Sequence, residues 1–216
     1  MMKLKWFSIA VTMAALILAS LATSCAPSTP SSSPPTETPP SAIGIVAPPT
    51  APVAKRALFV IYNQFEETQY DKPRTLLKDA GIEVIVASTS LNTVTGSNLK
   101  LVKPDIALAD VHGADYDAIV LIGSYAYVMD DPEAQRVVKE AAAAGKVLAA
   151  ICVAPITLAK AGLLKGKRAT SSIDIQSGGA IPVYDQDVVR DGLIITAYNT
   201  DAAQKFGETI LAALQE

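Results

Sequence analysis

The side chains best suited to covalent chemistry in this 216-residue chain are two cysteines and a single histidine. Cys152 stands in the run Ala150-Ile151-Cys152-Val153-Ala154, which follows an apolar stretch and precedes a proline. Small residues on both sides of a central nucleophile are typical of a nucleophile elbow, a sharp strand-to-helix turn that exposes the central side chain. Cys152 is therefore our candidate nucleophile. The alternative is a buried and unreactive cysteine.

The same counts exclude several classes of site. One histidine and two cysteines cannot build a multi-histidine or four-cysteine metal centre. No G-x-G-x-x-G motif follows a predicted strand, and the glycine loop 162–168 lacks the Ser or Thr of a phosphate loop. We therefore predict no metal and no cofactor. With a net charge of −3 and no long basic run, the chain also has no electrostatic signature of a nucleic-acid partner.

The first 53 residues have the composition of an export signal and a tether. Two lysines precede an uncharged stretch at 6–22, and Leu21-Ala22-Thr23-Ser24-Cys25 follows the apolar part. This ending resembles a bacterial lipoprotein signal, which predicts lipidation of Cys25, a signal segment at 1–25 and attachment to the outer side of the cell membrane. An uncleaved anchor and plain secretion are the alternatives. Residues 26–53 hold nine of the 14 prolines and are predicted to be a disordered linker.

Residues 54–216 are long enough for one well-buried domain. Apolar runs predict buried strands at 57–62, 82–88, 118–122 and 146–151, and a hairpin joins 188–189 to 193–196. Helices are predicted at about 71–80, 131–144, 155–161 and 201–214. This alternation indicates an α/β domain with a mainly parallel sheet and helices on both faces. Ligands bind such sheets at the carboxyl ends of the strands, which is where Cys152 is expected.

Several sequence blocks in this domain occur together in one known family. They include the segments 65–70, 73–74, 80–81, 87–88, 115–123, 150–152, 154–155 and 161–167. In this order they resemble the ThiJ/PfpI (DJ-one) family of the class I glutamine amidotransferase-like superfamily. The resemblance implies a flavodoxin-like three-layer sandwich and a homodimer. It also implies either a cysteine-dependent hydrolase or glyoxalase/deglycase-like enzyme, or a stress-response protein that senses oxidation.

The residues around the family's nucleophile depart from the usual pattern. Val153 stands where many members have histidine, and Gln69 stands where the family has a carboxylic acid. Glu66 lies on the same segment and is the candidate replacement acid or base, with Glu67 as its neighbour. The family's oxyanion hole maps onto Gly123-Ser124 and the backbone of Val153.

The only histidine is not expected to replace the missing base. His112 precedes a predicted strand by about six residues, so it should lie at the amino ends of the strands, away from Cys152. Two functions therefore remain open. In the first, Cys152 attacks the carbonyl carbon of a small molecule or peptide. In the second, Cys152 serves a redox-sensing or binding module without catalysis.

Overall fold

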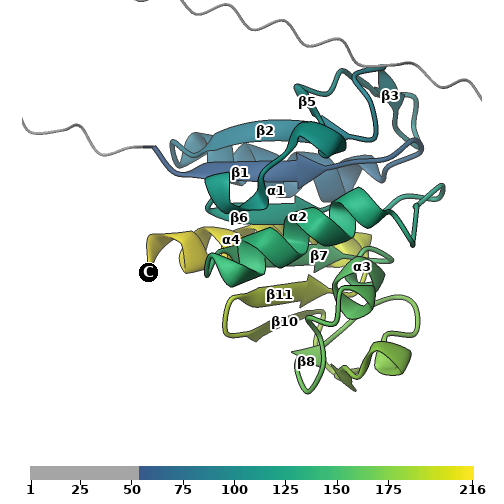
Figure 1. Cartoon of the computed structure of the whole chain (residues 1–216), viewed down its shortest axis with the longest axis vertical. Helices are drawn as coiled ribbons and strands as arrows, with labels where there is room; N and C mark the ends of the chain where they lie inside the picture. The colour runs from purple at the N-terminus through teal and green to yellow at the C-terminus, as the bar shows by residue number, and fades with distance from the viewer. Residues whose placement is uncertain (1–53) are drawn as a thin grey trace, which may run out of the picture. The chain divides into compact units, whose positions relative to one another are not determined.

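The computed structural model describes residues 54–216, and its central feature is a seven-stranded sheet (Figure 1). The strand order is β10-β11-β7-β6-β1-β2-β5, and all neighbours are parallel except β10 and β11. The strands are Arg56–Val60 (β1), Glu83–Ser88 (β2), Ile106–Ala107 (β5), Ala118–Leu121 (β6), Val147–Ile151 (β7), Val188–Asp191 (β10) and Ile194–Ala197 (β11). Two short pairs lie outside this sheet: Val94–Thr95 (β3) with Leu101–Val102 (β4), and Arg168–Ala169 (β8) with Ile181–Pro182 (β9).

Helices cover both faces of the sheet. The α-helices are Glu67–Asp79 (α1), Pro132–Ala143 (α2), Pro155–Lys160 (α3) and Ala203–Gln215 (α4), and the short 3₁₀ turns are Leu108–Asp110 (η1), Gly113–Asp115 (η2), Gln176–Gly178 (η3) and Thr200–Ala202 (η4). α1 and α4 pack against each other on one face, while α2 and α3 lie on the other (Figure 1). The fold is the predicted flavodoxin-like α/β sandwich.

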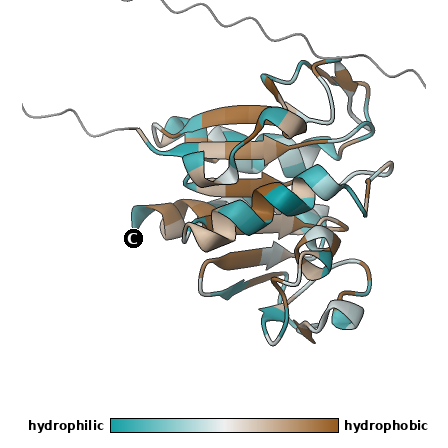
Figure 2. Ribbon diagram, in the orientation of Figure 1, coloured by the Kyte–Doolittle hydropathy of each residue, from teal (hydrophilic) through white to brown (hydrophobic). Residues whose placement is uncertain are grey.

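The sheet is apolar on both sides, which explains the continuous apolar runs in the sequence (Figure 2). Alternate residues of β1 enter different cores: Phe59 packs under α1 and α4, whereas Leu58 and Val60 pack under α2. All three side chains are buried. The strand predictions at 57–62, 82–88, 118–122 and 146–151 therefore correspond to β1, β2, β6 and β7 within one or two residues.

The prediction for the first helix was wrong at its beginning. We expected a start near Asp71, but α1 begins at Glu67 because the Glu66 carboxylate caps it and accepts a hydrogen bond from Gln69 N at 2.8 Å. The extra turn carries Gln69 into the interior, where it is 1% exposed. α2 begins as predicted, with Asp131 as its N-cap and Pro132 in the first turn.

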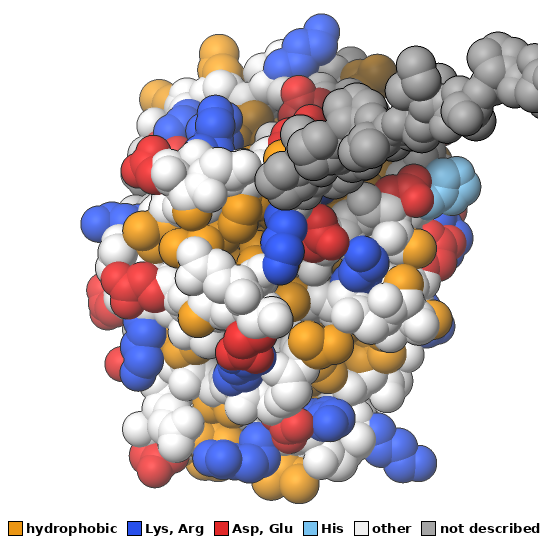
Figure 3. Space-filling model, turned by 90° about the vertical axis from the view of Figure 1, so that its left-hand side faces the viewer, with side chains coloured by type: hydrophobic (Ala, Val, Ile, Leu, Met, Phe, Trp, Pro, Cys, Tyr) orange, Lys and Arg blue, Asp and Glu red, His pale blue; other side chains and the backbone are white. Residues whose placement is uncertain are grey.

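The parallel strands point toward the right of Figure 1, so their carboxyl ends meet at one edge. Gly123 follows β6 and Cys152 follows β7 at this edge, which we call the carboxyl edge. The opposite edge carries Lys, Arg, Asp and Glu side chains interspersed on its surface (Figure 3). No helix within residues 54–216 is long and apolar enough to cross a bilayer. The predicted signal, linker and Cys25 lie outside the described residues.

Candidate functional site

Cys152 occupies the turn between β7 and α3 in a strained backbone conformation. Its φ is +66°, a left-handed value that a side chain with a Cβ adopts only at a cost of about 1–2 kcal/mol. The turn is held in place because Cys152 N donates to Ala197 O at 2.9 Å, and Pro155 starts α3 three residues later. The side chain is partly exposed, and no disulfide engages it. This is the geometry of a nucleophile elbow.

The thiol has one hydrogen-bond partner among the described side chains, the hydroxyl of Ser172. The distance from Cys152 Sγ to Ser172 Oγ is 3.3 Å. The loop that carries Ser172 is fastened to the elbow, because Cys152 O accepts hydrogen bonds from Ser172 N at 3.0 Å and from Ser171 Oγ at 2.8 Å. Cys152 and Ser172 are thus positioned against each other by backbone contacts as well as by their side chains.

Sequence reasoning did not find Ser172. The run Thr170-Ser171-Ser172 follows the two-residue strand β8, which is too short to produce a recognisable pattern. β8 also lies outside the seven-stranded sheet, so the rule that polar residues after a strand of a parallel sheet gather at its carboxyl edge does not reach Ser172. Applied to β11, which belongs to the sheet, that rule names Tyr198 and Thr200, which follow Ala197.

Gln69 lies beside Cys152, but its amide is hydrogen-bonded to other groups. Its Oε1 accepts from Gly123 N at 3.1 Å, and its Nε2 donates to Thr200 Oγ1 at 3.0 Å. Gly123 separates the two side chains: a Cβ there would lie 2.6 Å from Gln69 Oε1 and 2.9 Å from the Cβ of Cys152. Only glycine fits between them. Gly123 therefore leaves room for the side chains of Gln69 and Cys152, and its N–H donates to the amide oxygen of Gln69.

Two backbone N–H groups that directly follow Gly123 and Cys152 in the chain have no acceptor among residues 54–216. They belong to Ser124 and Val153, two of the positions predicted for an oxyanion hole. The Ser124 hydroxyl is engaged with other groups, since it donates to Asn63 O and accepts from Ala126 N at 3.0 Å. Unpaired N–H groups of this kind can stabilise a developing negative charge on oxygen.

The two glutamates at the start of α1 have structural contacts. Glu66 caps the helix, and its backbone N–H donates to Gly123 O at 2.9 Å. Glu67 Oε1 accepts from Asn98 N at 2.8 Å and from Lys100 N at 2.9 Å, which ties the β3–β4 hairpin to α1. Neither carboxylate is hydrogen-bonded to Cys152, so Glu66 remains only a prediction as an acid or base.

His112 lies where the sequence placed it. It is exposed and caps η2, which precedes the amino end of β6. Since β6 and β7 are parallel, Cys152 lies at the other end of the sheet. Within the described part of the chain, neither a carboxylate nor an imidazole forms a hydrogen bond with Cys152 Sγ.

Two packed tyrosines, the buried Tyr62 and the partly buried Tyr127, support the region behind the elbow. Tyr127 OH lies 2.8 Å from Thr157 Oγ1 on α3, and Tyr62 OH donates to Asp131 at 3.0 Å. Burial is the main reason why the pKa values of Tyr62 and Tyr127 lie well above the ordinary tyrosine value. Both phenols therefore stay neutral at physiological pH, and they hold the elbow helix and the N-cap of α2.

Together, the parallel sheet, the helices on both of its faces and the strained cysteine after β7 define a flavodoxin-like α/β protein that presents a cysteine at a strand-to-helix turn. The chain belongs to the DJ-1/PfpI family, whose sequence model matches residues 55–213.

Similar proteins agree with this assignment. An uncharacterized protein of Methanocaldococcus jannaschii is 33% identical over 172 residues, which cover 76% of this chain and 83% of that protein. Deglycase PfpI of Pyrococcus furiosus is 34% identical over 142 residues, which cover 63% of this chain and 86% of the deglycase. The crystal structure of Drosophila melanogaster DJ-1beta superposes with a TM-score of 0.68 at 28% identity, covering 76% of this chain and 95% of that one.

Proposed function

We propose that residues 54–216 form a cysteine-dependent enzyme, a hydrolase or glyoxalase/deglycase-like enzyme that acts on a carbonyl compound or peptide. The observation that supports this most is the combination of Cys152 at φ +66° with the two unpaired N–H groups of Ser124 and Val153. A nucleophile and an oxyanion hole at the same edge of the sheet are the minimum needed for attack on a carbonyl. Two relatives that carry the name deglycase, from Pyrococcus furiosus and Pyrococcus abyssi, support this class of activity, and we propose small reactive aldehydes as the substrates.

For a 2-oxoaldehyde the chemistry needs only water as a second reactant. The Cys152 thiolate forms a bond to the aldehyde carbon, and the C=O electron pair moves to oxygen, where the N–H groups of Ser124 and Val153 hold it. Hydrogen transfer from that carbon to the neighbouring carbonyl produces a thioester of a 2-hydroxy acid. Water then cleaves the thioester and releases the acid and the thiol. The thiol proton goes to solvent water when the thiolate forms, and the Ser172 hydroxyl, which lies 3.3 Å from Sγ, can donate a hydrogen bond to the thiolate.

The test is methylglyoxal turnover by the purified protein. Cys152→Ser should abolish formation of the 2-hydroxy acid, because a serine alkoxide is far harder to form than a thiolate. The Cys25→Ser variant is the matched control and should keep full activity. Absence of turnover in the wild type, or turnover that survives Cys152→Ser, contradicts the proposal.

A second function is favoured by the missing acid and base. Gln69 is neutral, and Ser172 is the only described side chain hydrogen-bonded to Sγ. A partly exposed thiol of this kind suits a redox-sensing module in which Cys152 is reversibly oxidised without turnover. Peroxide should then convert Cys152 to its sulfenic or sulfinic acid, detectable as a mass increase on the peptide that contains it. A thiol inert to both peroxide and iodoacetamide excludes this function.

We also propose that the domain is tethered by a lipid at Cys25 to the outer side of the cell membrane. The support is the sequence alone: an apolar segment, a cysteine after small residues and a proline-rich spacer. Detergent-phase partitioning of the wild-type protein, lost in Cys25→Ser, is the expected result. Partitioning unaffected by Cys25→Ser points instead to an uncleaved anchor, and absence of partitioning in the wild type points to secretion.

The homodimer is proposed from membership of the family. Light scattering of the protein in detergent, with the detergent mass subtracted, should report twice the mass of the chain. A single-chain mass at micromolar concentration contradicts the dimer.

A further inference from the structure

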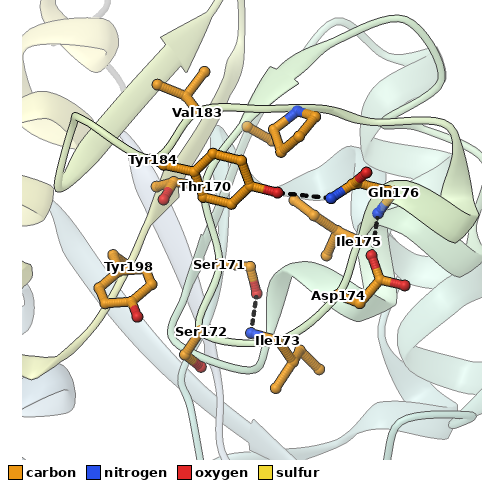
Figure 4. Close-up of a pocket in the computed structure, with 12 residues that line it drawn as sticks. Thr170, Ser171, Ser172, Ile173, Asp174, Ile175, Gln176, Val183, Tyr184 and Tyr198 are labelled. Atoms are coloured by element: carbon orange, nitrogen blue, oxygen red, sulfur yellow. Dashed lines mark hydrogen bonds between the residues drawn. The ribbon is translucent and has the colours of Figure 1, made fainter.

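A cavity of about 330 Å³ opens beside Cys152 and is not used by the chemistry described above. Its walls are the loop from Thr170 to Gln176, the segment from Pro182 to Tyr184, and Tyr198 (Figure 4). Ser172 belongs to the wall and is also the hydrogen-bond partner of Cys152 Sγ at 3.3 Å, so one shared side chain connects the cavity to the thiol. At about 30 Å³ per water molecule, it has room for roughly ten waters or a small organic ligand.

The polar groups of this wall are mainly uncharged hydroxyls. The hydroxyls of Thr170 and Tyr198 have no hydrogen-bond partner among residues 54–216, although Thr170 is only 3% exposed. Tyr184 is held by Gln176, whose Nε2 donates to its hydroxyl at 2.6 Å, so its ring borders the cavity in a defined position (Figure 4). Hydroxyl groups can both donate and accept, which suits a ligand that itself carries hydroxyls.

The charge of the wall selects against anions. Asp174 is its only ionisable acid, and no lysine or arginine of the described chain lines the cavity. A phosphate or carboxylate would meet the Asp174 carboxylate without a compensating cation. The rings of Tyr184 and Tyr198 offer apolar faces for the C–H groups of a carbon chain.

We propose that this cavity binds the uncharged, hydroxylated tail of a sugar-derived 2-oxoaldehyde while Cys152 attacks the aldehyde carbon. This substrate class rests on the cysteine-dependent activity proposed above. The cavity adds the selectivity: Tyr184 and Tyr198 contact the carbon chain, Thr170 and Ser172 bind its hydroxyls, and Asp174 repels charged analogues.

The first experiment compares two substrates in the full-length protein, purified in detergent. The measured quantity is the ratio of kcat/KM for 3-deoxyglucosone to kcat/KM for methylglyoxal, which has no hydroxylated tail. Tyr184→Ala should lower this ratio about tenfold. Tyr125→Ala is the matched control, because Tyr125 is 80% exposed, Tyr184 is 81% exposed, and Tyr125 lies outside the cavity. An unchanged ratio in Tyr184→Ala, or an equal fall in Tyr125→Ala, overturns the proposal.

The second experiment tests charge with ligands that cannot react. Glucitol should inhibit turnover of 3-deoxyglucosone at least fivefold more strongly than glucitol 6-phosphate, and Asp174→Asn should narrow that difference. Equal or stronger inhibition by the phosphate overturns the proposed selectivity.

A third measurement separates this proposal from the enzymatic one. Binding of 3-deoxyglucosone to Cys152→Ser is followed by chemical-shift changes in the protein, so no turnover is needed. If Tyr184→Ala abolishes this binding and Tyr125→Ala preserves it, the proposal that the cavity binds the substrate tail is supported. This holds even if the wild type turns over neither substrate, because that result contradicts only the proposed activity. Conversely, if the wild type turns over methylglyoxal but 3-deoxyglucosone does not bind to Cys152→Ser, the proposed activity stands. The proposal that the cavity binds the substrate tail is then contradicted.

Discussion

Cys152 and the groups packed around it show how closely individual side chains depend on one another at this turn. The backbone strain at Cys152 is held by hydrogen bonds from its own N–H and to its own carbonyl. Gly123 leaves room for Gln69 on one side and for Cys152 on the other. Gln69, which stands where the resemblance predicts a carboxylic acid, is therefore separated from the thiol by a single glycine.

Gln69→Glu should make the thiolate harder to form. The new carboxyl can keep both contacts of the amide, because Gly123 N and the Thr200 hydroxyl can both donate to it. A negative charge next to Cys152 disfavours a second one, so the pH at which iodoacetamide reacts at half its maximal rate should move upward by about one unit. Gln215→Glu, which adds the same charge at the far end of α4, is the control. A midpoint that stays in place would contradict a coupling between positions 69 and 152.

At the level of the strands, the amino ends of β1, β6 and β7 are joined by one carboxylate. Asp117 Oδ2 accepts from Arg56 N at 2.9 Å, and Asp117 Oδ1 accepts from Lys146 Nζ at 3.2 Å. Partial burial acts to raise the pKa of Asp117, but the hydrogen bonds from Arg56 and Lys146 outweigh burial and hold the pKa below its ordinary value. This anchor lies at the opposite edge of the sheet from Cys152.

Asp117→Asn should lower the free energy of unfolding at pH 7 by about 0.5–1 kcal/mol, a small value because the pair is partly exposed to solvent. The pKa of Asp117 is lower in the folded state, so its charge stabilises the fold above the ordinary carboxyl pKa of 3.8. That stabilisation is lost as the pH falls through the folded-state pKa. Urea unfolding from pH 7 to pH 2 should therefore show the two proteins converging in acid. Asp185→Asn, an exposed carboxylate in another loop, should show no such convergence.

The domain as a unit contains its own cores. Residues 54–216 build two cores, one under α1 and α4 and the other under α2 and α3. The family match covers the same region, residues 55–213. Folding of this region should therefore not require the first 53 residues.

A fragment of residues 54–216 should unfold at the same temperature as the full chain, within about 2 °C, because it holds both described cores and nearly all of the region that the family model matches. Differential scanning calorimetry of the fragment and of the full chain in the same detergent provides the comparison. A fragment that is unfolded, or that melts much earlier, would show that the linker packs on the domain. Methylglyoxal turnover by the fragment would in addition separate activity from membrane attachment.

Much of the architecture was predictable from the sequence, because buried parallel strands must be apolar on both faces and helices begin at recognisable caps. Asp131-Pro132 marked α2, and the apolar run ending at Ile151 marked the strand that presents Cys152. The start of α1 was missed because Glu66 caps the helix through a side-chain contact that apolar periodicity does not record.

The amino-acid sequence by itself determined the α/β class and the strand that leads into Cys152. It also determined that His112 lies at the opposite ends of the strands from Cys152, since each of these features follows from local patterns along the chain. The tertiary structure decided which groups surround the thiol. Ser172 lies 20 positions after Cys152 and Thr200 lies 131 positions after Gln69, yet each pair forms a hydrogen bond. Such contacts arise only when distant loops meet at the carboxyl edge of the sheet, and no local pattern encodes which side chain of a loop will point toward its neighbour.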